Sequence, residues 1–450
     1  MRKLLATMLV LLVPLWSCDP QHADWGFEAA ASIKTPADPP LRCGVALPSD
    51  TLARKRQHCA FGTGALPETT LGIAPAIAAQ IPIRHVIIMM KENRSYDHLF
   101  GALHDEGQPD SEAIPASYTN LDQNGQVVKP FVQTNTCYPQ DPGHQSKYMT
   151  EDVDGGKMDG FVKSAADATG TDGHFAMGHY DAQELPFYFW LANTYAVDDR
   201  HFAPVVSGTF ANRNFYLVGQ NAGAVDTGIV FPPPNTPSIM QLLTRAGFTW
   251  AVYTDGSPFS GTLDWSASDP GVHPLQDLYD ALDRGTLPNV AFVDGKDYIE
   301  DDHPDADLQT GEAWSRVIYQ HAVKSPEWNR LVIFWTYDEC GGFADHVAPP
   351  SACAAVAGSP FTERGPRIPF VAISPWAKRH YVSHVVHDHT AMTRFIELVF
   401  HLPALTARDA NSDALLDLFD FSCGHDALPI DSAPAAGTGD CHDPAPPGTN

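Results

Sequence analysis

Four side chains with oxygen donors follow directly on two apolar runs of the sequence. The runs are residues 85–90 and 331–336, and the side chains are Glu92, Asn93, Asp338 and Glu339. Continuous apolar runs of this length are typical of strands buried on both faces, and ligands bind beyond the carboxyl ends of such strands. The four side chains could therefore hold one divalent cation. An all-oxygen set favours Ca²⁺, Mg²⁺ or Mn²⁺, and Zn²⁺ also accepts carboxylate oxygens. The alternative is that they are ordinary solvated charges at strand ends.

Two hydroxyl side chains, Ser207 and Thr209, flank Gly208 just before an expected helix. A hydroxyl at a helix N-terminus can meet an anion that the backbone N–H groups also bind. A cation nearby would favour the alkoxide and create a nucleophile. The alternative is an ordinary Ser or Thr N-cap, which needs no ligand.

Three of the 20 histidines lie beside acidic residues in polar stretches, namely His144, His303 and His346. Each could bind a phosphoryl oxygen or act as a general acid. The alternative for each is a structural or surface histidine paired with its neighbour. No role is assigned to His387.

Further apolar runs and helical stretches alternate along the chain. Strands are predicted at 85–90, 248–254, 289–294, 331–336 and 370–374. Helices are predicted at 181–195, 237–247 with Thr236 as cap, 306–324 and 387–402. This alternation predicts an α/β fold with a mostly parallel central sheet and helices on both faces.

The composition limits the classes of partner. The chain has 450 residues, 44% of them hydrophobic, and a formal net charge of −26. The hydrophobic fraction allows a sizeable core, and the acidic balance argues against a nucleic-acid partner and against loose adsorption to anionic lipid. A phosphate ester remains compatible, because one local positive cluster can override a negative surface.

The N-terminus resembles an export signal. Arg2 and Lys3 precede an apolar stretch, residues 4–16, that is too short to span a bilayer, and Cys18 stands in a lipobox-like context. The mature protein is expected to be periplasmic, tethered to a membrane through a lipid on Cys18, or extracellular. The expected divisions are a signal peptide at 1–18, an arm at 19–80, a catalytic domain at 81–422 and a tail at 423–450.

Eight cysteines in an exported chain are expected to form disulfides. With Cys18 set aside, short-range pairing would leave Cys137 free. The expected pairs are Cys43–Cys59, Cys340–Cys353 and Cys423–Cys441.

Two long motifs carry a family resemblance. Residues 92–101, ENRSYDHLFG, resemble the ENRSFDHYFG signature of the bacterial and fungal phosphoesterase family, which includes acid phosphatases and phosphatidylcholine-type phospholipases C. Residues 337–347, YDECGGFADHV, resemble its second block. Shorter matches, Asn212-Arg213 among them, follow in the family's order over about residues 82 to 400. The resemblance implies an alkaline-phosphatase-like α/β fold.

The resemblance also implies roles for the candidate residues. Its metal ligands are Glu92, Asn93, Asp338, Glu339 and Thr209. Thr209 would be the nucleophile of a two-step reaction through a phosphothreonine. The phosphoryl group would be bound by Asn93, His144, His303 and His346, with His144 or His303 protonating the leaving oxygen. Two departures are Asp302 where the family often has Glu, and Ala211 where it usually has Pro.

Three functions remain open. An acid phosphatase acting on phosphomonoesters is expected, because the family's phospholipases C resemble longer chains with β-rich modules after the catalytic domain. Phospholipase C or another phosphodiesterase is the first alternative. An inactive surface lipoprotein that acts as a binding module is the second, and the intact set of candidate residues speaks against it. A sulfatase-like function lacks its Cys/Ser-x-Pro-x-Arg context.

Overall fold

The computed structural model describes residues 44–137, 140–226, 236–261, 271–304, 306–422 and 432–437, with the single residues 228, 230 and 232. The expected signal peptide, a lipid on Cys18 and the Cys423–Cys441 pair lie outside these residues. Within this part of the chain, no helix combines the length and the apolarity needed to cross a membrane.

A central sheet of eight strands positions the predicted site. Its order is β13-β6-β12-β11-β1-β10-β8-β9. In chain order these are β1 (His85–Lys91), β6 (Ala196–Asp198), β8 (Trp250–Tyr253), β9 (Val272–His273), β10 (Val290–Asp294), β11 (Leu331–Tyr337), β12 (Phe370–Ile373) and β13 (Tyr381–Ser383). All pairs are parallel except those of β12, which is antiparallel to β11 and β6. The prediction of a mostly parallel sheet is confirmed, as are its five predicted strands; β6, β9 and β13 were missed because they are short.

The register of the central strands brings the two motifs together. β1 pairs with β11 from His85 opposite Leu331 to Lys91 opposite Tyr337. Both strands are almost wholly buried, as their continuous apolar sequence requires. Because parallel strands in register end at the same edge, Glu92 and Asp338 leave the sheet side by side.

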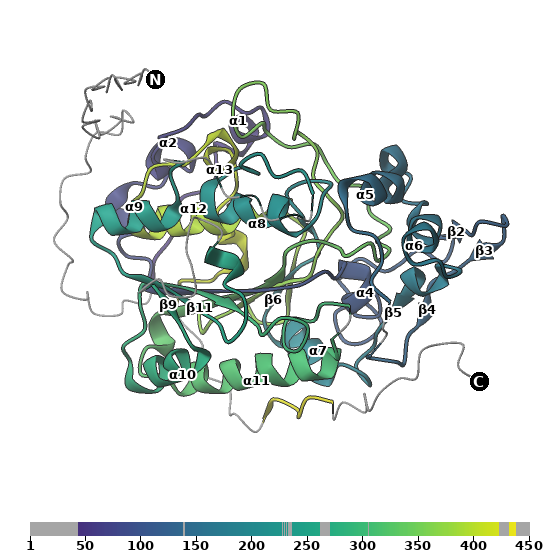
Figure 1. The fold of residues 1–450 in the computed structure, drawn as a ribbon. Helices are drawn as coiled ribbons and strands as arrows, with labels where there is room; N and C mark the ends of the chain where they lie inside the picture. The colour runs from purple at the N-terminus through teal and green to yellow at the C-terminus, as the bar shows by residue number, and fades with distance from the viewer. Residues whose placement is uncertain are drawn as a thin grey trace, which may run out of the picture.

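Helices cover both faces of the sheet, as predicted (Figure 1). One face carries α8 (Thr209–Val218), α9 (Ile239–Ala246) and α12 (His389–Phe400); the other carries α7 (Pro186–Thr194), α10 (Leu275–Arg284) and α11 (Leu308–Lys324). All four predicted helices begin later than predicted: α7 at Pro186 rather than 181, α11 at Leu308 rather than 306, and α9 and α12 two residues late. Ser238 rather than Thr236 caps α9, and Asp388 caps α12, so that His387 belongs to a short strand, β14 (His387–Asp388).

Smaller elements extend the domain beyond the sheet (Figure 1). They are α4 (Tyr96–Phe100), α5 (Ser146–Val153), α6 (Phe161–Thr169), β2 (Asn120–Leu121), β3 (Val127–Val128), β4 (Phe131–Val132) and β5 (Gly178–His179). The described part of the arm forms α1 (Ala53–Gln57), α2 (Pro67–Thr70) and α3 (Pro75–Ala78), and Leu71, Ile73 and Ala78 join the main hydrophobic core. The remaining elements are β7 (His201–Phe202), which pairs with β14, and α13 (Ala407–Ala410).

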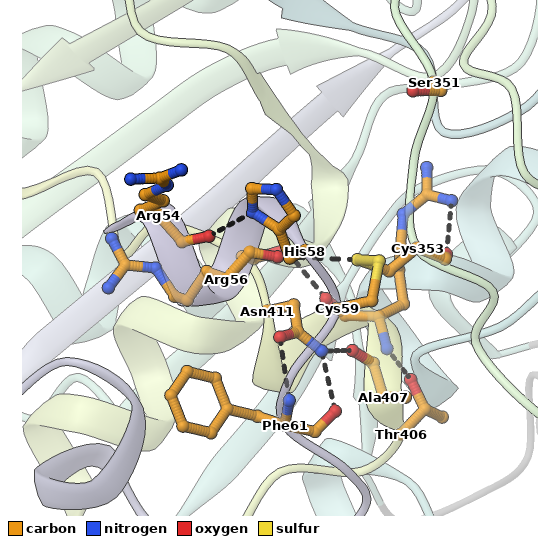
Figure 2. Close-up of a disulfide and its surroundings, with 12 residues drawn as sticks. Arg54, Arg56, His58, Cys59, Phe61, Ser351, Cys353, Thr406, Ala407 and Asn411 are labelled. Carbon is orange, nitrogen blue, oxygen red and sulfur yellow. Dashed lines mark hydrogen bonds between the residues drawn. A yellow bond between two sulfur atoms is a disulfide. The ribbon is translucent and has the colours of Figure 1, made fainter. Parts of the chain in front are cut away.

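A long-range disulfide joins the arm to the catalytic region. Cys59 pairs with Cys353 across a sequence separation of 294 residues (Figure 2). Beside it, the Asn411 side chain accepts from the Phe61 N–H and donates to the Phe61 carbonyl. The predicted short-range pairs of Cys59 and Cys353 were therefore wrong. So was the free Cys137, which is disulfide-bonded, whereas Cys340 is a buried free thiol. Pairing cysteines by their closeness in sequence gave the wrong disulfides, because the fold brings together cysteines that are far apart in the chain.

Removing the Cys59–Cys353 bond is expected to destabilise the fold. Disulfides typically stabilise by about 2–4 kcal/mol, and in the chain-entropy account the effect grows with the length of the closed loop. Cys59→Ala/Cys353→Ala should therefore lower the free energy of unfolding by at least about 2–4 kcal/mol. Urea unfolding would measure it. Cys340→Ala is the control, because it removes a buried sulfur but no cross-link. A double variant as stable as the wild type would contradict the prediction.

Candidate active site

The ends of β1 and β11 form the floor of the site. The backbone N–H of Asn93 donates to Asp338 Oδ1 at 3.0 Å, which ties the two strand ends together. Asn93 has φ +61°, a left-handed conformation that turns the chain sharply at the sheet edge and that Asn tolerates better than most residues. Glu92, Asn93, Asp338 and Glu339 are all at most 3% exposed. The alternative of solvated strand-end charges is therefore wrong.

The Asn93 side-chain amide lies among three carboxylates. With its nitrogen turned toward them it donates to Glu339 Oε1 at 2.7 Å and to Asp338 Oδ1 and Glu92 Oε2 at 3.1 Å each. Its oxygen then accepts from His303 Nε2 at 3.2 Å. With the amide in the opposite orientation, its oxygen would join the carboxylate oxygens in an all-oxygen set. Such a set is the donor chemistry of a hard divalent cation.

Glycine is required where the second motif passes the first. Gly341 has φ +65°, and a Cβ atom there would lie 2.2 Å from the carbonyl oxygen of Asn93. No side chain fits that contact. The double glycine of YDECGG thus allows β11 to deliver Asp338 and Glu339 next to Asn93.

The charge of the site is unbalanced. Buried Arg213 donates to Glu92 and to Asp294 Oδ1, and its Nε lies 3.6 Å from Asp338 Oδ2. One guanidinium thus contacts three buried carboxylates, those of Glu92, Asp294 and Asp338. Burial raises the pKa of Glu92 and of Glu339 well above the usual range, and the charge of Asp338 adds to both shifts. Asp338 Oδ2 has no hydrogen-bond partner. Added positive charge would stabilise these carboxylates in their charged form and give Asp338 Oδ2 a partner. These residues therefore fit a divalent cation.

Thr209 opens α8 and points to the same place. Gly208 is the N-cap of this helix, and no side chain caps it. The Thr209 hydroxyl instead donates to Glu92 Oε2 at 3.3 Å. The alternative of an ordinary Ser or Thr N-cap is therefore wrong. Asn212 holds the preceding loop by accepting from Val205 N–H and donating to the carbonyls of Ser207 and Gly208. The first N–H groups of α8 have no partners within the helix and can face an anion.

Two of the three predicted histidines lie beside this set. Asp141, His144 and His303 bring one ligand atom each within 4.8 Å of one another, a second arrangement that could hold a cation. Burial opposes a charge on His144, but Glu339 and Asp141 outweigh it and raise its pKa to about 10. Burial lowers the pKa of His303 to about 4. The two rings therefore carry different charges near neutral pH.

His303 is positioned by a buried ion pair that the sequence did not reveal. Lys91 Nζ lies 3.0 Å from Asp302 Oδ2, and both side chains are fully buried. Tyr188 and Tyr337 also donate to Asp302, whose own carbonyl accepts from Arg94 Nε. Asp302, which stands where the family often has Glu, thus contacts Lys91. The one available signal was a lysine ending an otherwise apolar strand.

Replacing Lys91 by Met should strongly destabilise the protein. Asp302 would be left buried without its counter-charge, which typically costs about 3–5 kcal/mol. Urea unfolding should show this loss, and Lys91→Met/Asp302→Asn should recover part of it because no charge is then left unpaired. Equal stabilities of the single and double variants would argue against a charge effect.

The third predicted histidine belongs to a different network. His346 Nδ1 lies 2.7 Å from Asp97 Oδ2, and Arg367 donates to Asp97 Oδ1 and to Asp345. His346 Nε2 lies 3.7 Å from Glu112 Oε1. These contacts are the structural pairing that was the alternative for this residue. They join the YDECGGFADHV segment to α4 rather than bring His346 to Thr209.

A model of the Phosphoesterase family matches residues 83–403. The chain is 26% identical to Phospholipase C B of Mycobacterium tuberculosis over 426 residues, 80% of this chain and 82% of that protein. It is 27% identical to Non-specific phospholipase C1 of Arabidopsis thaliana over 379 residues, 74% and 70% of the two chains. A solved protein of the alkaline phosphatase superfamily from Vibrio parahaemolyticus covers 86% of this chain and is itself covered to 76%, with a TM-score of 0.39 and 11% identity. That structural likeness is too weak to carry an argument.

Proposed function

This chain belongs to the phosphoesterase family and is a phosphoric ester hydrolase, and from that premise we propose that it is a phospholipase C-type phosphodiesterase with Thr209 as nucleophile. The observation that carries the proposal is the Thr209 hydroxyl at the start of α8, bonded to Glu92 within the oxygen set of the sheet edge.

The chain's own residues divide the reaction between them. Thr209 Oγ1 attacks phosphorus, a new O–P bond forms, and the bond from phosphorus to the leaving alcohol breaks. The N–H groups that open α8 bind the phosphoryl oxygens. His144, which carries a proton near neutral pH, gives a proton to the leaving oxygen, and water then cleaves the phosphothreonine by the reverse path. Glu92, Asn93, Asp338 and Glu339 would hold one divalent cation, which when bound neutralises phosphoryl charge and favours the Thr209 alkoxide.

The substrate proposal departs from the acid phosphatase expected from the sequence. The relatives reported above are phospholipases C, matched over more than two thirds of both chains. The surroundings of His303 agree with a lipid-like leaving group. The Tyr298 ring packs on His303 with centroids 4.6 Å apart and is 57% exposed, and the neighbouring Ile299 is 44% exposed. A phospholipid substrate would also bring the protein to a membrane without a lipid on Cys18.

Three substrates separate the candidate activities. The purified protein should hydrolyse p-nitrophenyl phosphorylcholine and phosphatidylcholine vesicles faster than p-nitrophenyl phosphate. Hydrolysis of p-nitrophenyl phosphate alone would instead support the acid phosphatase activity expected from the sequence. Release from no substrate, with divalent cation supplied, would favour the inactive binding module.

Ile299 provides a sharper test of the lipid substrate. Ile299→Ser should lower hydrolysis of phosphatidylcholine vesicles about fivefold or more, because burying such a side chain in apolar surroundings contributes about 1.5–3 kcal/mol. It should leave hydrolysis of soluble p-nitrophenyl phosphorylcholine unchanged. Val317→Ser on α11, where Val317 is 37% exposed, is the matched control and should change neither rate. Equal loss on both substrates would mean that Ile299 acts on the site itself and not on lipid.

We also propose that the enzyme is exported. The N-terminal pattern of Arg2, Lys3 and residues 4–16 motivates this, and the Cys59–Cys353 disulfide is compatible with an oxidising compartment. Labelling with radioactive palmitate would test a lipid on Cys18.

A further inference from the structure

A further group of potential metal ligands lies where β14 meets the segment after α13. His387 is fully buried on β14, and Asp413 and Asp417 are about one quarter exposed. One ligand atom from each lies within 4.8 Å of the others. These residues take no part in the phosphoesterase chemistry described above.

Three atoms of this group have the spacing of metal ligands. His387 Nε2 lies 3.6 Å from Asp413 Oδ1 and 3.7 Å from Asp417 Oδ1, both too long for hydrogen bonds. For bonds of about 2.1 Å in a tetrahedral arrangement, neighbouring ligand atoms lie about 3.4 Å apart. Small side-chain shifts would therefore let one cation contact all three.

The other atoms of these side chains are already engaged. Asp413 Oδ2 pairs with Arg56 at 3.0 Å, and Asp417 Oδ2 accepts from the Ser383 hydroxyl. His387 Nε2 and Asp417 Oδ1 are buried without a hydrogen-bond partner. The two carboxylates thus present their remaining oxygens to an imidazole nitrogen that has nothing else to bind.

The other ring nitrogen of His387, Nδ1, also has the kind of partner that is common in metal sites. His387 Nδ1 lies 2.7 Å from Asp198 Oδ2, and Asp198 is fully buried at the end of β6. A ligating histidine commonly donates its other N–H to a carboxylate, which fixes the ring and raises its basicity. His201 also lies against Asp198, with Nδ1 3.4 Å from Oδ2.

We propose that His387 Nε2, Asp413 Oδ1 and Asp417 Oδ1 bind a divalent transition-metal ion of the Zn²⁺ type, separate from the active site. An imidazole with two carboxylates suits Zn²⁺ better than Mg²⁺ or Ca²⁺, which prefer oxygen alone. The ion would fasten the segment after α13 to β14 and, through Arg56, to the N-terminal arm. Its role is structural.

The competing occupant of the same place is a proton. Burial opposes a charge on His387, but Asp198 and the neighbouring acids outweigh it and raise the pKa of His387 well above the usual value. A protonated ring held by three carboxylates would need no metal. The experiment must therefore count metal rather than measure activity.

Zinc binding by the full-length chain distinguishes the two. The protein carrying Asp338→Asn and His303→Ala, which disable the sheet-edge set and the group of Asp141, His144 and His303, would be stripped of metal and dialysed against Zn²⁺. Its bound zinc would be counted by mass spectrometry. We expect about one Zn²⁺ per chain and a higher Tm with zinc. Adding Asp417→Asn should weaken zinc binding by at least about tenfold and abolish the Tm rise. Adding Asp420→Asn instead, in the same segment, should change neither.

Two outcomes would overturn the proposal. Either the Asp338→Asn/His303→Ala chain binds no zinc, or it binds zinc equally well with and without Asp417→Asn. The single variant Asp417→Asn should keep its phosphoesterase activity within about twofold, which shows that any loss of zinc is not a loss of folding. A failure here would leave the proposed phosphodiesterase activity untouched.

Discussion

Replacing Thr209 by Ala is expected to lower kcat/KM for phosphoester hydrolysis by at least about 10³-fold, because each 1.36 kcal/mol of lost transition-state stabilisation is a factor of ten. The variant removes the only atom proposed to attack phosphorus. The helix itself should survive, since Gly208 is its N-cap and the hydroxyl takes no part in capping. Thr209→Ser should retain partial activity because it keeps an oxygen at this position.

Ser207 is the matched control for Thr209. Its hydroxyl stands two residues earlier in the same loop and donates to the carbonyl of Val225 at 2.9 Å. Ser207→Ala should therefore keep most of the activity, measured on p-nitrophenyl phosphorylcholine. Near-normal turnover by Thr209→Ala would contradict the assignment, and equal losses in both variants would point to a disturbed loop.

Replacing Asp338 by Asn is expected to lower activity by at least about 10²-fold. The change keeps the shape of the side chain but removes the charge of an oxygen that lies at the centre of the proposed cation set. Loss of a ligand should weaken cation binding by more than the tenfold to hundredfold typical of residues behind the ligands. Chelation of the wild type should have the same effect, and an added divalent cation should reverse it.

Asp152→Asn tests whether changing any buried carboxyl group to an amide explains such a loss. Asp152 is also a fully buried carboxylate, and burial raises its pKa well above the usual range. It lies on α5, outside the sheet-edge set. The variant should keep its activity in the assay that shows the loss in Asp338→Asn. Full activity of Asp338→Asn after chelation would contradict a cation at this site.

The parts of the fold that could be predicted are those with strong local patterns. β1 and β11 are continuous apolar runs, and each ends in polar residues that had to meet at one sheet edge if the strands were parallel. Short edge strands such as β13 carry too few residues for a pattern. The antiparallel direction of β12 depends on its connection, which its own residues do not encode.

Some residues of the candidate site could likewise be predicted from local patterns, and others could not. Glu92, Asn93, Asp338 and Glu339 could be found because strand ends locate them. Asp294 and Lys91 were missed, since their partners come from distant segments, 81 and 211 residues away respectively in the pairs with Arg213 and Asp302. The cysteine pairs were wrong for the same reason, because the nearest cysteines in sequence are not partners in space. The contact of His346 with Asp97, 249 residues away, is likewise not indicated by its neighbours in sequence.

The mass of the protein trapped during turnover tests most directly whether Thr209 is the nucleophile. Wild-type protein mixed with p-nitrophenyl phosphorylcholine would be quenched in acid, digested and analysed by mass spectrometry. We expect a phosphorylcholine group on the peptide that contains Thr209, and no such adduct in Thr209→Ala. Rapid hydrolysis with the adduct on another residue, or an adduct that persists in Thr209→Ala, would contradict it.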